Sequence, residues 1–128
     1  MIHLLDTATV LALGTEPDIV PWRTRELLAE PGTEISVSVV SVWEGTELAL
    51  AGKLSFDRPL ESWIRDFCQT YAASVLDFKL THAAHLVKVP HNGGTMFDRL
   101  LVATALVEGA AIVSPRAELA AYPVRVVW

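Results

Sequence analysis

Three acidic residues, Asp6, Glu44 and Asp98, stand where the predicted elements bring them to the same edge of a sheet. Asp6 directly follows the apolar strand 2–5, Glu44 lies in the helix after strand 34–38, and Asp98 lies in the first turn of the apolar helix 96–107. In an open α/β sheet, ligand-binding residues gather at the carboxyl ends of the strands. Because carboxylates that meet without a counter-charge repel one another, this pattern predicts a divalent metal site.

Strands alternate with helices along the chain, and no linker, repeat or low-complexity segment interrupts them. Alternation of this kind implies right-handed βαβ units. We therefore predict one α/β domain over residues 1–128, built around a mostly parallel sheet. The predicted strands are 2–5, 34–38, 74–77, 111–113 and 124–127. The predicted helices are 8–13, 18–29, 42–50, one from Pro59, 80–87 and 96–107, with a short one after Pro115.

The composition agrees with a buried parallel sheet. Hydrophobic residues make up 52% of the 128 residues, enough for a core without disulfides. Cys68 is the only cysteine, so no intramolecular disulfide can form, which favours a reducing, cytoplasmic compartment. The longest apolar stretch, after Arg99, is broken by Glu108 and Gly109, so no membrane span is expected.

The net charge of −5 gives no general attraction to a nucleic-acid backbone. A nucleic-acid partner would need local groups of cations. Arg99 and Arg116 are candidates, because arginine binds phosphate through two parallel hydrogen bonds. Each taken alone also fits an ordinary helix-surface residue.

Single positions exclude several other α/β families. A haloacid-dehalogenase-type phosphatase would carry a second Asp two residues after Asp6, where Ala8 stands. A response-regulator receiver would need a late lysine, and none follows Lys88. Nucleotide-binding Rossmann and P-loop folds would need a glycine-rich loop after the first strand, which this chain lacks.

Four segments carry a resemblance to a known family. They are Leu4–Thr7 (LLDT), Ser38–Glu44 (SVVSVWE), Phe97–Ala105 (FDRLLVATA) and Val126–Trp128 (VVW). In this order and spacing, the chain resembles the PIN-domain ribonucleases, specifically the VapC-like toxins of toxin–antitoxin pairs. The resemblance spans nearly the whole chain and implies a three-layer α/β/α sandwich around the parallel sheet.

The resemblance also implies an activity, that of a Mg²⁺- or Mn²⁺-dependent endoribonuclease. Matched position by position, Asp6, Glu44 and Asp98 correspond to the metal-binding, catalytic acids of the family. It further implies a homodimer and a small antitoxin protein that covers the active site. The residues expected beside the site or the RNA substrate are Thr7, Arg99, Ser114 and Arg116.

Two positions depart from the family pattern. Many relatives carry an Asp three residues before the acid matched by Asp98, followed by Pro, where this chain has Thr95 and Met96. The family also commonly places an Asp two residues after the Ser or Thr that ends the fourth strand, and counting from Ser114 leads to Arg116. A cation therefore stands where an acid is expected, and three acids remain, enough for one metal ion.

These departures support an alternative function. The chain would then be a PIN domain with weakened or lost catalysis that acts as an RNA- or protein-binding module. In that case Arg116 pairs with Asp6 or Asp98 and neutralises the acids without a metal.

The acids also have purely structural interpretations. The segment Ser41–Glu44 fits a helix capping box, and Thr95–Asp98 has related capping chemistry. An acid in the first turn of a helix is favoured by the helix dipole as well. Asp6 has the weakest structural alternative, because Asp disfavours continued strand after four strand residues.

Histidine and tryptophan residues are predicted to be structural. His82 and His85 lie three apart but lack the third ligand of a zinc site, so we expect surface or boundary residues. Trp43 and Trp63 are expected to pack in the core or at a subunit interface, with RNA base stacking as the alternative.

Overall fold

Short apolar runs form the strands, because a parallel strand covered on both faces needs apolar side chains on both. The computed structural model describes all 128 residues. Its five strands pair in the order β3-β2-β1-β4-β5, and every neighbouring pair is parallel. The predicted α/β class is confirmed, with a sheet that is wholly parallel. The strands are β1 (Ile2–Leu5), β2 (Glu34–Ser38), β3 (Ala73–Leu76), β4 (Ala111–Val113) and β5 (Val126–Val127).

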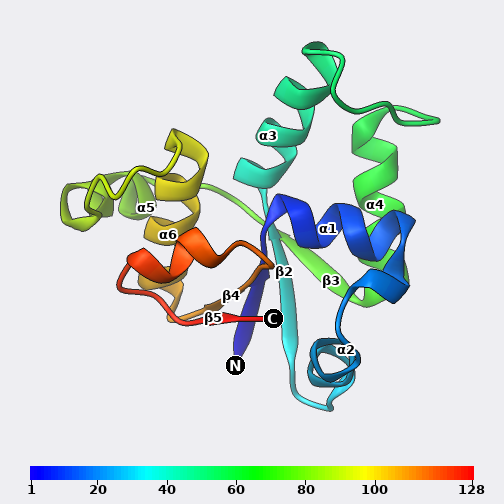
Figure 1. The fold of residues 1–128 in the computed structure, drawn as a ribbon, viewed down its shortest axis with the longest axis horizontal. Helices are drawn as coiled ribbons and strands as arrows, with labels where there is room; N and C mark the ends of the chain where they lie inside the picture. The colour runs from blue at the N-terminus through cyan, green and yellow to red at the C-terminus, as the bar shows by residue number, and fades with distance from the viewer.

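Helices cover both faces of this sheet and give the three-layer α/β/α arrangement (Figure 1). One side carries α1 (Thr7–Thr15), α2 (Trp22–Ala29) and α4 (Leu60–Tyr71). The other side carries α5 (Leu80–His85) and α6 (Met96–Glu108). The helix α3 (Val39–Leu50) continues from the end of β2 and extends beyond the carboxyl edge of the sheet. Three short 3₁₀ helices complete the chain, η1 (Pro17–Ile19), η2 (Leu86–Lys88) and η3 (Ala117–Ala121).

The sheet separates two hydrophobic cores. Leu5 belongs to the core with α1, α2 and α4, whereas its neighbour Leu4 belongs to the core with α6. Successive strand residues point to opposite faces of the sheet. Because helices cover both faces, both leucines are fully buried. No helix in the structure has both the length and the apolar composition needed to span a membrane.

The register of the strands determines which residues meet at the carboxyl edge. Leu5 pairs with Val37 on one side and with Val113 on the other. The residues that follow the neighbouring strands β1 and β4, Asp6 and Ser114, therefore lie side by side at that edge. The short connections from β1 to α1 and from β2 to α3 place the first turns of two helices there too.

The structure corrects some predicted boundaries. The predicted helix 18–29 is divided at Pro21 into η1 and α2, because proline cannot donate the hydrogen bond that a continuous helix needs. The predicted capping box at Ser41 is wrong. Helix α3 begins at Val39, and Ser38 is its N-cap, accepting a hydrogen bond from the Val40 N–H at 3.0 Å.

The expectation for His82 is also wrong, since its side chain is completely buried. Its Nδ1 accepts the Lys79 N–H at 2.9 Å, so the proton is on Nε2, which donates to Glu108 at 2.8 Å. This pair links α5 to the end of α6. Trp63 is buried as expected, whereas Trp43 is 55% exposed and packs edge-on against Phe97.

Two helical glycines predict opposite responses to alanine. A Cβ on Gly14 in α1 would lie 2.4 Å from the buried Trp63 ring, whereas a Cβ on Gly45 in α3 would make an ordinary 3.5 Å contact with Leu60. We expect Gly14→Ala to lower the free energy of unfolding by about 1–3 kcal/mol through overpacking. Gly45→Ala should raise it by about 0.5–1 kcal/mol, because alanine loses less backbone entropy in a helix. Urea unfolding of both variants measures this, and a stabilising Gly14→Ala would contradict the packing of α1 on α4.

Candidate active site

Asp6 is fixed by the abrupt change from β1 to α1. It is the N-cap of α1, and its Oδ1 accepts hydrogen bonds from the Thr9 N–H at 2.8 Å and the Thr9 hydroxyl at 2.7 Å. The Ser114 hydroxyl, which follows β4, donates to Oδ2. Asp6 is buried, and three donors on two elements hold its carboxylate. Such a group is positioned before any ligand arrives.

Glu44 reaches the same region from α3. It lies in the second turn of that helix and does not cap it, so the capping role considered for this residue does not apply. The Thr7 hydroxyl, in the first turn of α1, donates to Glu44 Oε1. This contact joins α1 to α3 across the carboxyl edge of the sheet.

The Asp98 carboxylate has two partners, Thr95 at the start of α6 and the Arg116 guanidinium. The Thr95–Asp98 capping box is confirmed. The Asp98 N–H donates to Thr95 Oγ1 at 3.1 Å, and the Thr95 N–H donates to Asp98 Oδ2 at 3.0 Å. The Asp98 side chain is only 5% exposed.

Arg116 holds the other side of the Asp98 carboxylate. Its Nη1 donates to Oδ1 at 2.5 Å, and its Nη2 donates to Oδ2 at 3.1 Å. Its Nε donates to Glu118 at 3.2 Å. The hydrogen bond to Asp98 is the main cause that raises the pKa of Arg116, so the guanidinium is ionised at neutral pH. The pKa of Glu118 is lowered, first by a backbone hydrogen bond and then by Arg116.

Asp6 and Asp98 therefore belong to one connected network. The Arg116 N–H donates to Ser114 Oγ at 3.0 Å, and that hydroxyl donates to Asp6. The residue that binds Asp98 through its side chain is thus tied to Asp6 through its backbone. A hollow of about 230 Å³ opens at this network, and its polar walls are Asp6, Thr7, Glu44, Thr95 and Arg116.

The charge of this network is unbalanced. Asp6, Asp98, Glu118 and the nearby Glu44 supply four carboxylates, whereas Arg116, which hydrogen-bonds to Asp98 and Glu118, supplies a single guanidinium. Carboxylate and hydroxyl oxygens are the donors that Mg²⁺ and Mn²⁺ prefer, so the donor set fits such an ion chemically. In the observed arrangement no three His, Cys, Asp or Glu side chains close around a common point. Asp98 is instead turned to Arg116.

Sequence reasoning missed two residues beside Asp98. A Cβ on Gly94 would lie 2.0 Å from the Tyr122 hydroxyl and 3.1 Å from Asp98 Oδ2, so only glycine fits between them. The Tyr122 hydroxyl is buried without a hydrogen-bond partner. No local sequence pattern indicates that Tyr122 lies beside Asp98, because its position depends on how η3 packs. Thr9 was also missed, although Asp-x-x-Thr at the end of a strand is a capping signal.

Arg99, expected beside the site, has a different role. Its side chain is buried, and its Nη2 donates to the carbonyl oxygens of Val89 at 3.0 Å and Leu86 at 3.3 Å. The guanidinium thus fastens the segment after α5 to α6. The structure brings the other expected residues to one edge of the sheet: Asp6, Thr7, Glu44, Asp98, Ser114 and Arg116.

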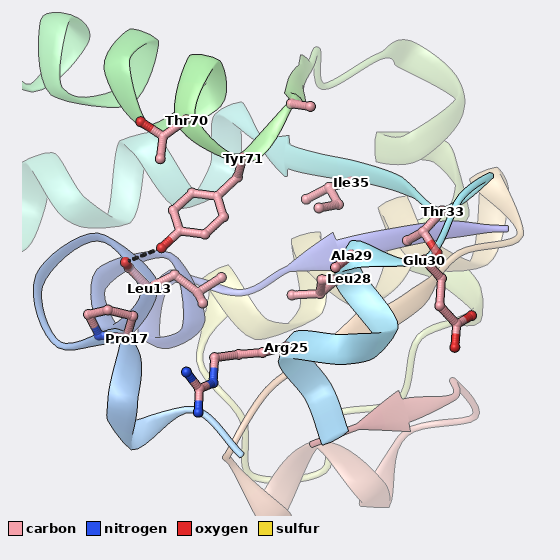
Figure 2. Close-up of a pocket in the computed structure, with 11 residues that line it drawn as sticks. Leu13, Pro17, Arg25, Leu28, Ala29, Glu30, Thr33, Ile35, Thr70 and Tyr71 are labelled. Carbon is pink, nitrogen blue, oxygen red and sulfur yellow. Dashed lines mark hydrogen bonds between the residues drawn. The ribbon is translucent and has the colours of Figure 1, made fainter. Parts of the chain in front are cut away.

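A larger cavity, of about 450 Å³, shares no lining residue with the hollow at these acids. Figure 2 shows the residues that line it. It is formed by the end of α1, by α2, by the start of β2 and by the end of α4. Leu13, Leu28 and Ile35 give it an apolar wall, and the Tyr71 hydroxyl donates to the Leu13 carbonyl oxygen at 2.6 Å. This cavity contains no group of acids, so its larger size does not make it the candidate active site.

Comparisons with known proteins agree with the fold. A family model described as the PIN domain matches residues 4–116. Among solved structures, VapBC2 from Rickettsia felis, bound to a DNA fragment from its promoter, is 18% identical, with a TM-score of 0.76 over 99% of this chain and 98% of that chain. VapBC-1 from nontypeable Haemophilus influenzae is 18% identical, with a TM-score of 0.65 over 99% and 97% of the two chains. FitAcB from Neisseria gonorrhoeae is 21% identical, with a TM-score of 0.64 over 100% and 97%. A search of curated proteins finds no significant match.

The crowding at Gly94 predicts a coupled effect. Gly94→Ala should destabilise the fold by about 1–3 kcal/mol, because its methyl group collides with a buried ring. Tyr122→Phe removes the hydroxyl that lies nearest the new methyl group. We therefore expect the double variant to be more stable than the sum of the two single effects. Urea unfolding of all four proteins tests this coupling, and strictly additive effects would show that Gly94 and Tyr122 do not touch.

Proposed function

This chain belongs to the PIN-domain family, and from that premise we propose that it is a Mg²⁺- or Mn²⁺-dependent endoribonuclease that hydrolyses RNA phosphodiester bonds. PIN domains are generally nucleases. The observation that carries the proposal is the group of positioned acids at the carboxyl edge of the sheet, with Asp6 buried between Thr9 and Ser114. An acid held in this way for structural reasons alone would need no further carboxylates beside it.

Asp6, Glu44 and Asp98 are the residues that would hold the cation. When bound, the cation would offset charge on the scissile phosphate and make water a stronger nucleophile near neutral pH. The protein supplies the positions: Thr9 and Ser114 fix Asp6, Thr7 fixes Glu44, and the capping box fixes Asp98. Because the acids sit on three different elements, their alignment depends on the intact fold.

The biological setting follows from the relatives as part of the same proposal. The similar structures include VapBC assemblies and a toxin–antitoxin complex from Klebsiella pneumoniae. We propose that this chain is likewise a toxin, a single PIN-like domain over residues 1–128 that works in the cytoplasm as a homodimer. A cognate antitoxin protein would inhibit it by covering the acids.

A second function is favoured by one specific contact, the double hydrogen bond of Arg116 to Asp98. If a divalent cation never replaces this arginine, the domain has lost catalysis and binds RNA or protein instead. The two functions differ in a simple property. A nuclease site gains stability from Mg²⁺ or Mn²⁺, because only the folded state assembles the ligands.

Asp98→Asn is the most direct test of the nuclease function. Asparagine can still accept the Thr95 N–H, so the helix cap survives, but it lacks the charge that binds a cation. We expect RNA cleavage to fall by about a hundredfold or more, since even outer-shell partners of a metal cost roughly ten- to hundredfold. Stability should fall by only about 1–3 kcal/mol, through the weakened contact with Arg116. Cleavage of a labelled RNA by purified protein, with Mg²⁺ or with a chelator, measures the first effect.

The matched control is Asp18→Asn, the same chemical change at a fully exposed position in η1. It should cleave RNA as the wild type does. Undiminished cleavage by Asp98→Asn would remove Asp98 from the catalytic set. Absence of cleavage by the wild type, with a melting temperature indifferent to both ions, would favour the binding module.

A further inference from the structure

We propose that the Arg116 guanidinium is a resident counter-ion of Asp98, and that a divalent cation gains this carboxylate only by displacing it. The inference rests on the assignment of Asp98 as a metal ligand under the proposed function. It assigns to Arg116 a role in setting cation affinity.

The geometry makes the two cations compete for one carboxylate. Arg116 contacts both oxygens of Asp98, at 2.5 Å and 3.1 Å, and the Thr95 N–H takes a further position on Oδ2. A divalent ion on the same carboxylate would lie in contact with a group of like charge. Because the Asp98 side chain is 5% exposed, little water is present to screen that repulsion.

The arginine is the partner that can move. Asp98 is buried and tied to the N-terminus of α6, whereas the Arg116 side chain is 31% exposed. Its Nε already hydrogen-bonds to Glu118, whose side chain is 62% exposed. A displaced guanidinium therefore keeps an acidic partner nearer to solvent. The Arg116 backbone stays in place, since its N–H is held by Ser114 Oγ.

Displacing the Arg116 guanidinium from Asp98 also costs free energy, and this cost can be measured. The double hydrogen bond is of the charge-assisted, bidentate type, the strongest class in proteins. An interaction of this class corresponds to roughly ten- to hundredfold in an equilibrium constant. Removing the guanidinium should therefore tighten cation binding by about tenfold or more, while the cation-free protein loses the stability that the contact provides.

The experiment compares Mn²⁺ binding by isothermal titration calorimetry in wild type and Arg116→Gln, without RNA. We expect about tenfold tighter binding in Arg116→Gln. The matched control is Arg125→Gln, which removes the same charge at the opposite end of the sheet, before β5. It should bind Mn²⁺ as the wild type does. An equal gain in both variants would show that only net charge matters and would overturn the inference.

Thermal melting gives a second readout from the same proteins. Without metal, Arg116→Gln should melt below the wild type, because the buried Asp98 loses its partner. Saturating Mn²⁺ should narrow this gap, since the variant gains more from the ion. A gap that Mn²⁺ leaves unchanged would mean that arginine and metal do not compete, and the inference would fail.

If Arg116→Gln does not fold, Arg116→Lys is a second variant for the same comparison of Mn²⁺ affinity. Lysine retains the charge but cannot make the double contact, so its Mn²⁺ affinity should lie above that of the wild type. Equal Mn²⁺ affinity in the wild type and the Arg116 variants overturns this inference and leaves the nuclease function intact. No Mn²⁺ binding in any of the proteins overturns both.

Discussion

The parallel sheet imposes one constraint on which the rest of the site depends: its carboxyl edge gathers acids that need a counter-charge. Asp6, Glu44 and Asp98 come from three elements separated widely in sequence. The register of β1 with β2 and β4 aligns Asp6, the start of α3 and Ser114 at this edge, and Arg116 connects Ser114 to Asp98. The N-termini of α1 and α6 help, because their dipoles and N–H groups favour ionised acids. They cannot balance the full charge. Within the chain, Arg116 supplies a counter-charge to Asp98 and Glu118.

The acids divide into two kinds by what else they do. Asp6 and Asp98 cap helices as well as line the site, so each has a structural reason to be present. Glu44 caps no helix, since Ser38 caps α3 and Glu44 lies beyond the first turn. Its side chain accepts a hydrogen bond from the Thr7 hydroxyl. Helix capping therefore explains Asp6 and Asp98 but does not explain Glu44.

Local sequence patterns predicted most of the fold, because apolar strands and capped helices are encoded by neighbouring residues. β2 and β4 have the predicted bounds, and the Thr95–Asp98 cap is as expected. The predictions were wrong where tertiary packing determines the position of a residue. Ser38 and Ser41 are both plausible caps, and only the lack of a loop after β2 selects the first. The burial of His82 and of Arg99 depends on partners on other elements, Glu108 for one and the carbonyl oxygens near Val89 for the other. The approach of Tyr122 to Gly94 likewise has no local signal.

Family membership defines the scaffold, and the site decides what the scaffold does. The similar structures share 16–21% identity with this chain and keep the same fold. Arg116 has a position where it can serve either function. If the free energy of cation binding exceeds that of the contact with Asp98, the acids form a metal site and the arginine stays beside it on Glu118. If it does not, the same contact leaves Asp98 paired with Arg116, and the surface serves for binding. The difference between the two functions is therefore one competition between two cations for one carboxylate.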